Sequence, residues 1–214
     1  AAIRAKVTAA RRRLNGSRAA LERDARDYAA LAQKLLMPAK PKLIAIGGLS
    51  GTGKSLLARA LAPDLPPSPG AVVLRSDVER KALFGASETE RLPEAAYAAD
   101  ATAKVYATLA EKAQRVTVAG HSAIVDAVFA QPSERGDIAK AAGGATFQGL
   151  FLTANLKTRL TRVGGRTGDA SDADTIVARK QEEFDLGRIN WAKVDASGTP
   201  EETLIRAEAM LGRK

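Results

Sequence analysis

Short apolar runs alternate with longer, mostly helix-forming stretches from residue 43 to the end of the chain. Each run is a few residues long and rich in aliphatic side chains, as in strands buried on both faces of a parallel sheet. The alternation predicts an α/β fold, in which helices cover both faces of a five-stranded, mainly parallel sheet. The predicted strands are Leu43–Ile46, Val72–Leu74, Ala123–Val125, Phe147–Leu152 and the neighbourhood of Lys193–Val194, and helical stretches include Leu56–Ala62, Glu94–Val116 and Thr199–Leu211.

Residues 1–41 show a different pattern, that of an amphipathic helical arm. Asn15-Gly16-Ser17 interrupts it with a helix-ending glycine and a helix-starting serine, which favours two helices, at about 3–14 and 18–36. We therefore expect an arm at 1–41 and one α/β domain at 42–214. The apolar seam of the arm consists of Ile3, Val7, Ala10, Leu14, Leu21, Tyr28, Leu31 and Leu35.

The composition bounds the class of protein. A chain of 214 residues with 45% hydrophobic content can bury one sizeable core. It contains no cysteine, which excludes disulfides and thiolate metal sites and favours an intracellular setting. No apolar stretch approaches the roughly 18 residues needed to span a bilayer, and no signal-peptide pattern opens the chain, so we expect a soluble, cytoplasmic protein without a membrane partner. The chain begins Ala-Ala-Ile, which suggests processing or a piece of a longer protein.

The net charge of +9 is concentrated in the arm. Residues 1–42 hold eleven Lys or Arg against three acids, so that the remainder, with 22 basic and 21 acidic side chains, is nearly neutral. A basic helix can bind an acidic surface, but a solvated face around a packing seam is the simpler interpretation. Nucleic acid is therefore a partner that we do not favour, and the α/β domain lacks the basic stripe expected for a long polyanion.

The strongest chemical signal is the run from Gly48 to Ser55, which follows the first strand and opens a helix. This is the order that a phosphate-binding P-loop requires, and a chance Gly-rich turn containing Lys-Ser would not need it. Backbone N–H groups of such a loop cradle a phosphate, Lys54 reaches the β- and γ-phosphates, and the Ser55 hydroxyl ligates Mg²⁺. The predicted nucleotide-binding residues here are Gly48, Leu49, Ser50, Gly51, Thr52, Gly53, Lys54, Ser55 and Leu56.

Asp77 and Arg80 follow the second predicted strand and share one side of a helical turn. A carboxylate beside the γ-phosphate can accept a proton from an attacking hydroxyl, and an arginine one turn on can hold substrate anions. The spacing equally allows Asp77 to be a helix N-cap with Arg80 solvated.

Asp126 ends the third predicted strand, where an acid in P-loop enzymes serves Mg²⁺ or its waters. With Ser55 it forms the predicted metal site. The alternative is a buried strand-end carboxylate that accepts hydrogen bonds from backbone N–H groups. His121, the only histidine, we interpret as structural.

Three arginines, Arg159, Arg162 and Arg166, precede and enter a glycine-broken helix end. A mobile lid bearing Arg162 and Arg166 would neutralise charge on a transferring phosphoryl group and exclude water. For Arg159 we favour a solvent-exposed position. Ser171 to Asp174 fits a capping box that starts the next helix.

These motifs together resemble the small P-loop kinases grouped with polynucleotide kinase and zeta toxin, over roughly residues 42–212. The resemblance implies the three-layer α/β/α fold of P-loop NTPases, ATP and Mg²⁺ as cofactors, and Asp77 as general base for an acceptor hydroxyl. It implies a catalytic set of Lys54, Asp77, Arg80, Arg162 and Arg166.

A closer resemblance is to the ATP-binding half of bifunctional bacterial proteins in which an aminoglycoside-phosphotransferase-like domain comes first. The runs Leu74–Arg80, Val125–Phe129 and Arg166–Ala173 are typical of that group. The resemblance implies that the arm is the tail of an upstream phosphotransferase-like domain, and that Ala196, Ser197, Gly198 and Thr199 lie near the adenine. Arg162 is a further predicted cofactor-binding residue. Leu56 departs from the group, since many relatives have threonine there.

The sequence thus predicts an ATP- and Mg²⁺-dependent kinase that phosphorylates a hydroxyl of a small molecule such as a sugar, an antibiotic or a nucleotide-type acceptor. The alternatives are a 5′-hydroxyl polynucleotide kinase and a nucleotide-binding regulatory ATPase module.

Overall fold

The computed structural model describes residues 1–11, 18–36, 39–165 and 169–212. The chain divides into two compact units, Ala1–Ala39 and Lys40–Lys214. In the first, helix α1 (Ala2–Arg11) packs against helix α2 (Arg18–Leu36), and Arg4 lies over the Tyr28 ring at 5.9 Å from its centroid. The predicted break at Asn15–Ser17 lies outside the described residues. Among the described helices, none is both long enough and apolar enough to cross a membrane.

The second unit is built on a five-stranded sheet in the order β2-β3-β1-β4-β5, with every neighbouring pair parallel. All five strands form where the apolar runs predict them, so the predicted fold class is confirmed. The register aligns Arg75 and Ile46 with Asp126, which brings the carboxyl ends of the three strands together. The strands are β1 (Lys42–Gly47), β2 (Val72–Arg75), β3 (Ala123–Asp126), β4 (Thr146–Thr153) and β5 (Ala192–Asp195).

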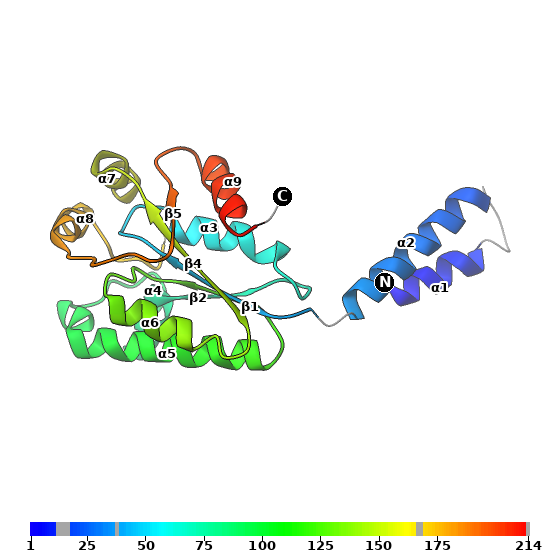
Figure 1. Cartoon of the computed structure of the whole chain (residues 1–214), viewed down its shortest axis with the longest axis horizontal. Coiled ribbons are helices and arrows are strands. Elements are labelled where there is room, and N and C mark those ends of the chain that lie inside the picture. The colour runs from blue at the N-terminus through cyan, green and yellow to red at the C-terminus, as the bar shows by residue number, and fades with distance from the viewer. Residues whose placement is uncertain (12–17, 37–38, 166–168, 213–214) are drawn as a thin grey trace. The chain divides into compact units, whose positions relative to one another are not determined.

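Helices cover both faces of this sheet (Figure 1). On one face, α3 (Lys54–Leu61) and α9 (Pro200–Met210) share a core with Ile44 and Ile46. On the other, α5 (Ala99–Val118) and α6 (Pro132–Lys140) share a core with Leu43 and Ala45. The alternation of buried residues along β1 therefore explains the three layers. The remaining helices are α4 (Ser76–Leu83), α7 (Leu156–Gly164) and α8 (Thr175–Lys180), with short 3-10 turns η1 (Ala62–Asp64), η2 (Glu94–Tyr97) and η3 (Gln181–Glu183).

The helical stretch predicted over Glu94–Val116 forms in two parts. It is divided into η2 and α5 at Ala98, whose backbone is extended, with φ −57° and ψ 157°. The Ala96 carbonyl in η2 accepts a hydrogen bond from Arg80 Nη1 at 2.6 Å. A tertiary contact thus uses a carbonyl that a continuous helix would pair with its own N–H groups.

The predicted capping box from Ser171 to Asp174 is wrong. Helix α8 begins three positions later, with Asp174 as its N-cap, and the Asp174 carboxylate accepts from the N–H groups of Ile176 and Val177, each at 2.9 Å. The Ser171 side chain instead donates a hydrogen bond to the Asp77 carboxylate. Two strong acceptor contacts at one residue therefore decide where the helix starts.

Candidate functional site: a P-loop cavity

The glycine loop between β1 and α3 has the backbone that its glycines allow. Gly48 and Gly53 have φ of +136° and +92°, in the region that favours glycine. A Cβ on Gly48 would lie 2.6 Å from the Leu152 carbonyl oxygen, so the loop passes close beneath β4. Gly53 is the N-cap of α3 and has no side chain to accept from the first-turn N–H groups. Those groups are therefore available to an anion.

Lys54 and Thr52 bend back over the same loop. The Thr52 hydroxyl donates to the Leu49 carbonyl at 2.8 Å, and Lys54 Nζ donates to that carbonyl at 3.3 Å. Both hydrogen bonds stabilise the turn of the loop before α3. The geometry fits a phosphate cradle with one ammonium at its mouth.

The two predicted metal ligands meet at the sheet edge. Ser55 Oγ donates a 2.5 Å hydrogen bond to Asp126 Oδ2, and Asp126 is buried. A hydroxyl and a carboxylate oxygen held together in this way fit a hard cation such as Mg²⁺. No group of three or more His, Cys, Asp or Glu suited to a metal occurs in the part of the chain that the structure describes. A magnesium ion held here would therefore need further oxygen ligands from a phosphate or water.

Asp77 lies in the first turn of α4, whose N-cap is Arg75, so the capping interpretation of Asp77 is wrong. Burial raises the pKa of the Asp77 carboxyl, as does the nearby Asp126 carboxylate, while Lys54, Arg75 and the Ser171 hydroxyl oppose the rise. The net direction is upward. A carboxylate with a raised pKa is a stronger base than an exposed one.

One cavity of about 1560 Å³ joins these groups. At one end, here called the nucleotide end, it is lined by the P-loop from Ser50 to Leu56 and by Arg162. At the other, the acceptor end, the walls come from η2, α5, the start of α6 and the segments before η2 and after β3. They include Leu92, Tyr97, Tyr106, Phe129 and Glu134. Asp77 and Asp126 line the same cavity. Its size and two ends suit a nucleotide and a second small molecule.

Arg80 also lines this cavity, but it is buried rather than solvated as the alternative interpretation proposed. Its Nη1 donates to the Ala96 carbonyl at 2.6 Å and to Thr102 Oγ1 at 3.2 Å, and its guanidinium lies 4.9 Å from the Tyr97 ring centroid. These contacts hold η2 and α5 against α4. The contact with a substrate anion stays a prediction.

The prediction of an exposed Arg159 is wrong, because its side chain is 1% exposed. Its Nε donates to the Ser50 carbonyl at 2.8 Å, its Nη2 donates to the Ala178 carbonyl at 3.0 Å, and its Nη1 pairs with Glu182. Gln181 Oε1 accepts from the Ser50 N–H at 2.7 Å. Arg159 therefore ties the P-loop to α7, α8 and η3.

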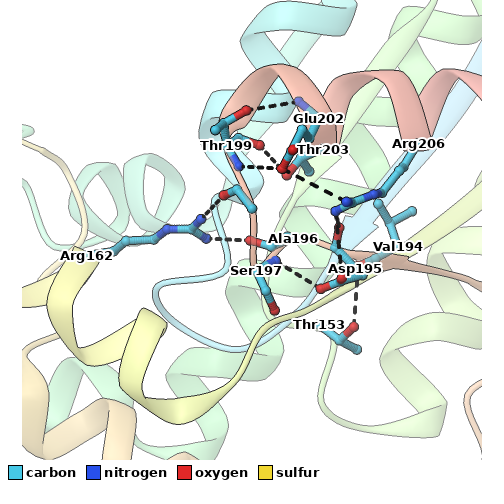
Figure 2. Close-up of polar contacts among 11 residues, drawn as sticks. Thr153, Arg162, Val194, Asp195, Ala196, Ser197, Thr199, Glu202, Thr203 and Arg206 are labelled. Atoms are coloured by element: carbon cyan, nitrogen blue, oxygen red, sulfur yellow. Dashed lines mark hydrogen bonds and ion pairs between the residues drawn. The ribbon is translucent and has the colours of Figure 1, made fainter.

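Arg162 reaches from α7 to the loop that follows β5 (Figure 2). Its Nη1 and Nη2 donate to the carbonyls of Ala196 and Gly198 at 2.7 and 2.6 Å. Gly198 and the predicted adenine-side residues Ser197 and Thr199 are not among the described residues that line the cavity, whereas the adjacent Pro200 is. Arg166, the second predicted lid arginine, lies outside the described residues.

The loop itself is held by its own side chains (Figure 2). Asp195 Oδ1 accepts from the Ser197 N–H at 2.9 Å, and Thr199 and Glu202 form a capping box at the start of α9. Their adenine-side role stays a prediction. These contacts fix the loop to the end of β5 and to the start of α9.

Residues that the sequence did not single out complete the site. Arg75 lies between Ser55, Asp126 and Asp169, and Lys81 forms a 2.9 Å ion pair with Asp172. Asp172 Oδ2 also accepts from the Tyr97 hydroxyl at 2.6 Å. In the sequence, these residues could have been noticed only as charges clustered beside the predicted motifs. Their ion pairs join residues far apart in the chain, so the sequence does not show which charges pair.

Several solved structures similar to this chain are described as kinases. A gluconokinase from Sinorhizobium meliloti has a TM-score of 0.57 and 21% identity, covering 81% of this chain and 93% of that one. A Janibacter sugar kinase has a TM-score of 0.59 and 17% identity, covering 81% and 95%. The Mycobacterium tuberculosis APS kinase in complex with AMPPNP and APS has a TM-score of 0.55 and 19% identity, covering 82% and 99%. These likenesses show a fold shared with P-loop kinases.

Sequence comparison gives relatives and a family. Uncharacterized proteins of Mycobacterium tuberculosis and Mycobacterium bovis are 28% identical over 218 residues, covering 97% of this chain and 42% of each relative. The chain thus spans less than half the length of these curated relatives. Residues 43–185, from β1 to just past η3, match AAA_33, described as an AAA domain. Since that match covers more than half of the chain, the protein belongs to the AAA_33 family of AAA domains.

Proposed function

We propose that this protein is an ATP- and Mg²⁺-dependent kinase that transfers the γ-phosphoryl group to a hydroxyl of a small molecule. One observation carries the proposal: a single cavity joins the P-loop to a half-buried carboxyl, Asp77, and continues to an acceptor end. A nucleotide-binding switch does not need that second compartment. The identities of structurally similar proteins, a gluconokinase and a sugar kinase among them, agree with a small-molecule acceptor.

In the proposed reaction, the P-loop amides and Lys54 hold the phosphates at the start of α3. Ser55 and Asp126 would hold Mg²⁺, which when bound neutralises charge on the phosphate oxygens. Asp77 accepts the proton of the acceptor hydroxyl as that oxygen forms its bond to the γ-phosphorus and the bond to the leaving ADP oxygen breaks. Arg162 and Arg166 are proposed to act over the phosphates, and Ser197 to Thr199 beside the adenine. Arg80 shapes the acceptor end through Ala96 and Thr102.

The acceptor end favours a neutral or cationic molecule. Among the described residues that line it, the cations are Arg80, which donates to a carbonyl, and Arg91, which pairs with Asp174 at 3.0 Å. The acids that line the same end are Asp77, Glu94, Glu134, Asp137 and Asp172, and of these Asp137 pairs with Lys140 and Asp172 with Lys81. Cations that already contact a carbonyl or a carboxylate attract a ligand anion weakly, and the acids of this end repel it. Carboxylate and phosphate ligands are therefore disfavoured. We therefore place a polyhydroxylated small molecule before a 5′-hydroxyl polynucleotide.

The test is mass-spectrometric detection of phosphorylated products after incubation of the protein with Mg·ATP and a metabolite extract. The wild type should form a product that Asp77→Asn and Lys54→Ala fail to form at a comparable rate. A slow ATP loss that is the same with every acceptor would instead indicate a regulatory ATPase. A 5′-hydroxyl oligonucleotide included in the panel identifies the polynucleotide alternative if it alone is phosphorylated.

A further inference from the structure

Arg75, the last residue of β2, lies against both groups proposed to hold the metal. Its Nη2 is 3.2 Å from Ser55 Oγ, and its Nε is 3.4 Å from Asp126 Oδ2. The same Nη2 donates to Asp169 Oδ1 at 2.7 Å. The side chain is only 9% exposed. A guanidinium is therefore built into the site where a divalent cation would sit.

The nitrogen atoms of the Arg75 guanidinium differ in their hydrogen bonding. Its Nη2 serves both Ser55 and Asp169, whereas its buried Nε has no hydrogen-bond partner among the residues that the structure describes. A buried N–H without a partner costs free energy, so a structural role alone does not explain this arrangement. The Nε instead contributes charge to Asp126 at a distance at which no good hydrogen bond forms.

We propose that Arg75 makes metal binding depend on the nucleotide. Its guanidinium neutralises the negative charge of Asp126, so that a divalent ion binds only when a phosphate oxygen adds further negative charge. The chain supplies two side-chain ligands, Ser55 and Asp126, and Mg²⁺ commonly binds through one or two such ligands together with substrate phosphates. A divalent ion placed on these ligands alone would meet the guanidinium charge at close range. The inference rests on the metal role proposed above for Ser55 and Asp126.

The charges around the site agree with this role. Among the residues that the structure describes, the carboxylates of Asp77, Asp126 and Asp169 lie near the cations of Lys54 and Arg75. Burial by itself lowers the pKa of Arg75, but its hydrogen bond to Asp169 and the charges of all three carboxylates raise the pKa overall, so the guanidinium stays charged. Replacing Arg75 by a neutral residue removes a positive charge next to Asp126 and uncovers the metal ligands.

The test measures Mn²⁺ binding to the whole chain without nucleotide, by electron paramagnetic resonance. The wild type should bind Mn²⁺ no better than millimolar, and Arg75→Gln should bind it about tenfold or more tightly. Arg115→Gln removes the same charge from an exposed position on α5 and should behave like the wild type. Adding Ser55→Ala to Arg75→Gln should abolish the gained binding.

Two results would overturn the inference. One is tight Mn²⁺ binding by the wild type without nucleotide, which needs no variant and so stands even if Arg75→Gln fails to fold. The other is a folded Arg75→Gln protein, judged by its thermal transition, whose Mn²⁺ affinity equals that of the wild type. Gained binding that survives Ser55→Ala would show that the metal assignment itself is wrong. None of these readouts requires phosphoryl transfer, so failure of the kinase proposal is recognised separately.

Discussion

Two sets of basic groups in the α/β domain differ in what they contact. At the nucleotide end of the cavity, Lys54 and the first N–H groups of α3 lie at the mouth of the P-loop. Other basic side chains of the domain are buried and donate to backbone carbonyls or carboxylates of other segments. This second set, here called the buried basic set, comprises Arg80, Lys81, Arg135 and Arg159.

The difference shows that positive charge near a cavity does not by itself mean anion binding. A guanidinium whose donors meet carbonyls connects segments and has few donors left for a ligand. Substitutions should therefore separate in their effects: changes to the groups proposed to bind phosphate or to move the proton, Lys54 and Asp77, alter turnover, and changes to the buried basic set alter stability. The largest separation should come from Asp77 and Arg159, which lie close to the same P-loop.

Asp77→Asn should lower phosphoryl transfer by about 10²-fold or more while leaving ATP affinity nearly unchanged. Asparagine keeps the size of the side chain but cannot accept the hydroxyl proton. Steady-state kinetics with the identified acceptor, together with calorimetric titration of nucleotide, measures both quantities. Turnover equal to that of the wild type would remove Asp77 from the role of base.

The raised pKa of Asp77 gives the same residue a pH signature. A base must be deprotonated, so kcat/KM should fall as pH drops through a pKa above the usual aspartate range. The residual activity of Asp77→Asn should lack that limb. If kcat/KM of Asp77→Asn still falls at low pH as in the wild type, the titrating group is not Asp77.

Arg159→Met should lower the free energy of unfolding by about 3 kcal/mol, because it leaves Ser50, Ala178 and Glu182 without their buried donor. For a domain of this size the melting temperature should fall by about 10 °C. Arg115→Met, on the exposed face of α5, is the matched control and should change stability by less than about 0.5 kcal/mol. Equal melting temperatures for the two variants would contradict a structural role for Arg159.

Arg159 also shows where sequence-based prediction ends. The five strands and the glycine loop depend on local apolar runs and backbone requirements, and these were predicted correctly. The burial of Arg159 depends on Ser50, 109 residues away, and on α8 folding back across it. The partners of Arg75 and Lys81, Asp169 and Asp172, lie 94 and 91 positions along the chain. The helical spacing of a charged residue in the sequence does not show whether its side chain is exposed to solvent or buried under a loop.

Asp172→Asn should have a smaller, pH-dependent effect on stability. Burial by itself raises the pKa of Asp172, but hydrogen bonds from Tyr97, Leu92 and Lys81 and the charge of Lys81 lower it overall. A lowered pKa in the folded state gives stability that is present above the unfolded pKa of about 3.9 and lost as pH falls through the folded value. Urea unfolding should therefore show a loss of about 1–2 kcal/mol at neutral pH that shrinks in acid. A difference independent of pH would contradict the charge-based account.

Arg162→Met has the smallest expected effect if the residue only holds the loop after β5, and it separates that role from the one proposed over the phosphates. Through the loop alone, loss of the contacts to the Ala196 and Gly198 carbonyls should raise the KM for ATP about 3- to 10-fold. If Arg162 acts over the transferring phosphoryl group instead, kcat falls by about 10²-fold and KM changes little. Arg162→Lys sharpens the result, because one ammonium keeps the charge but cannot match the paired contacts of the guanidinium fork. A KM change shared by both variants would assign Arg162 to the loop, and a kcat rescued by lysine would assign it to phosphate.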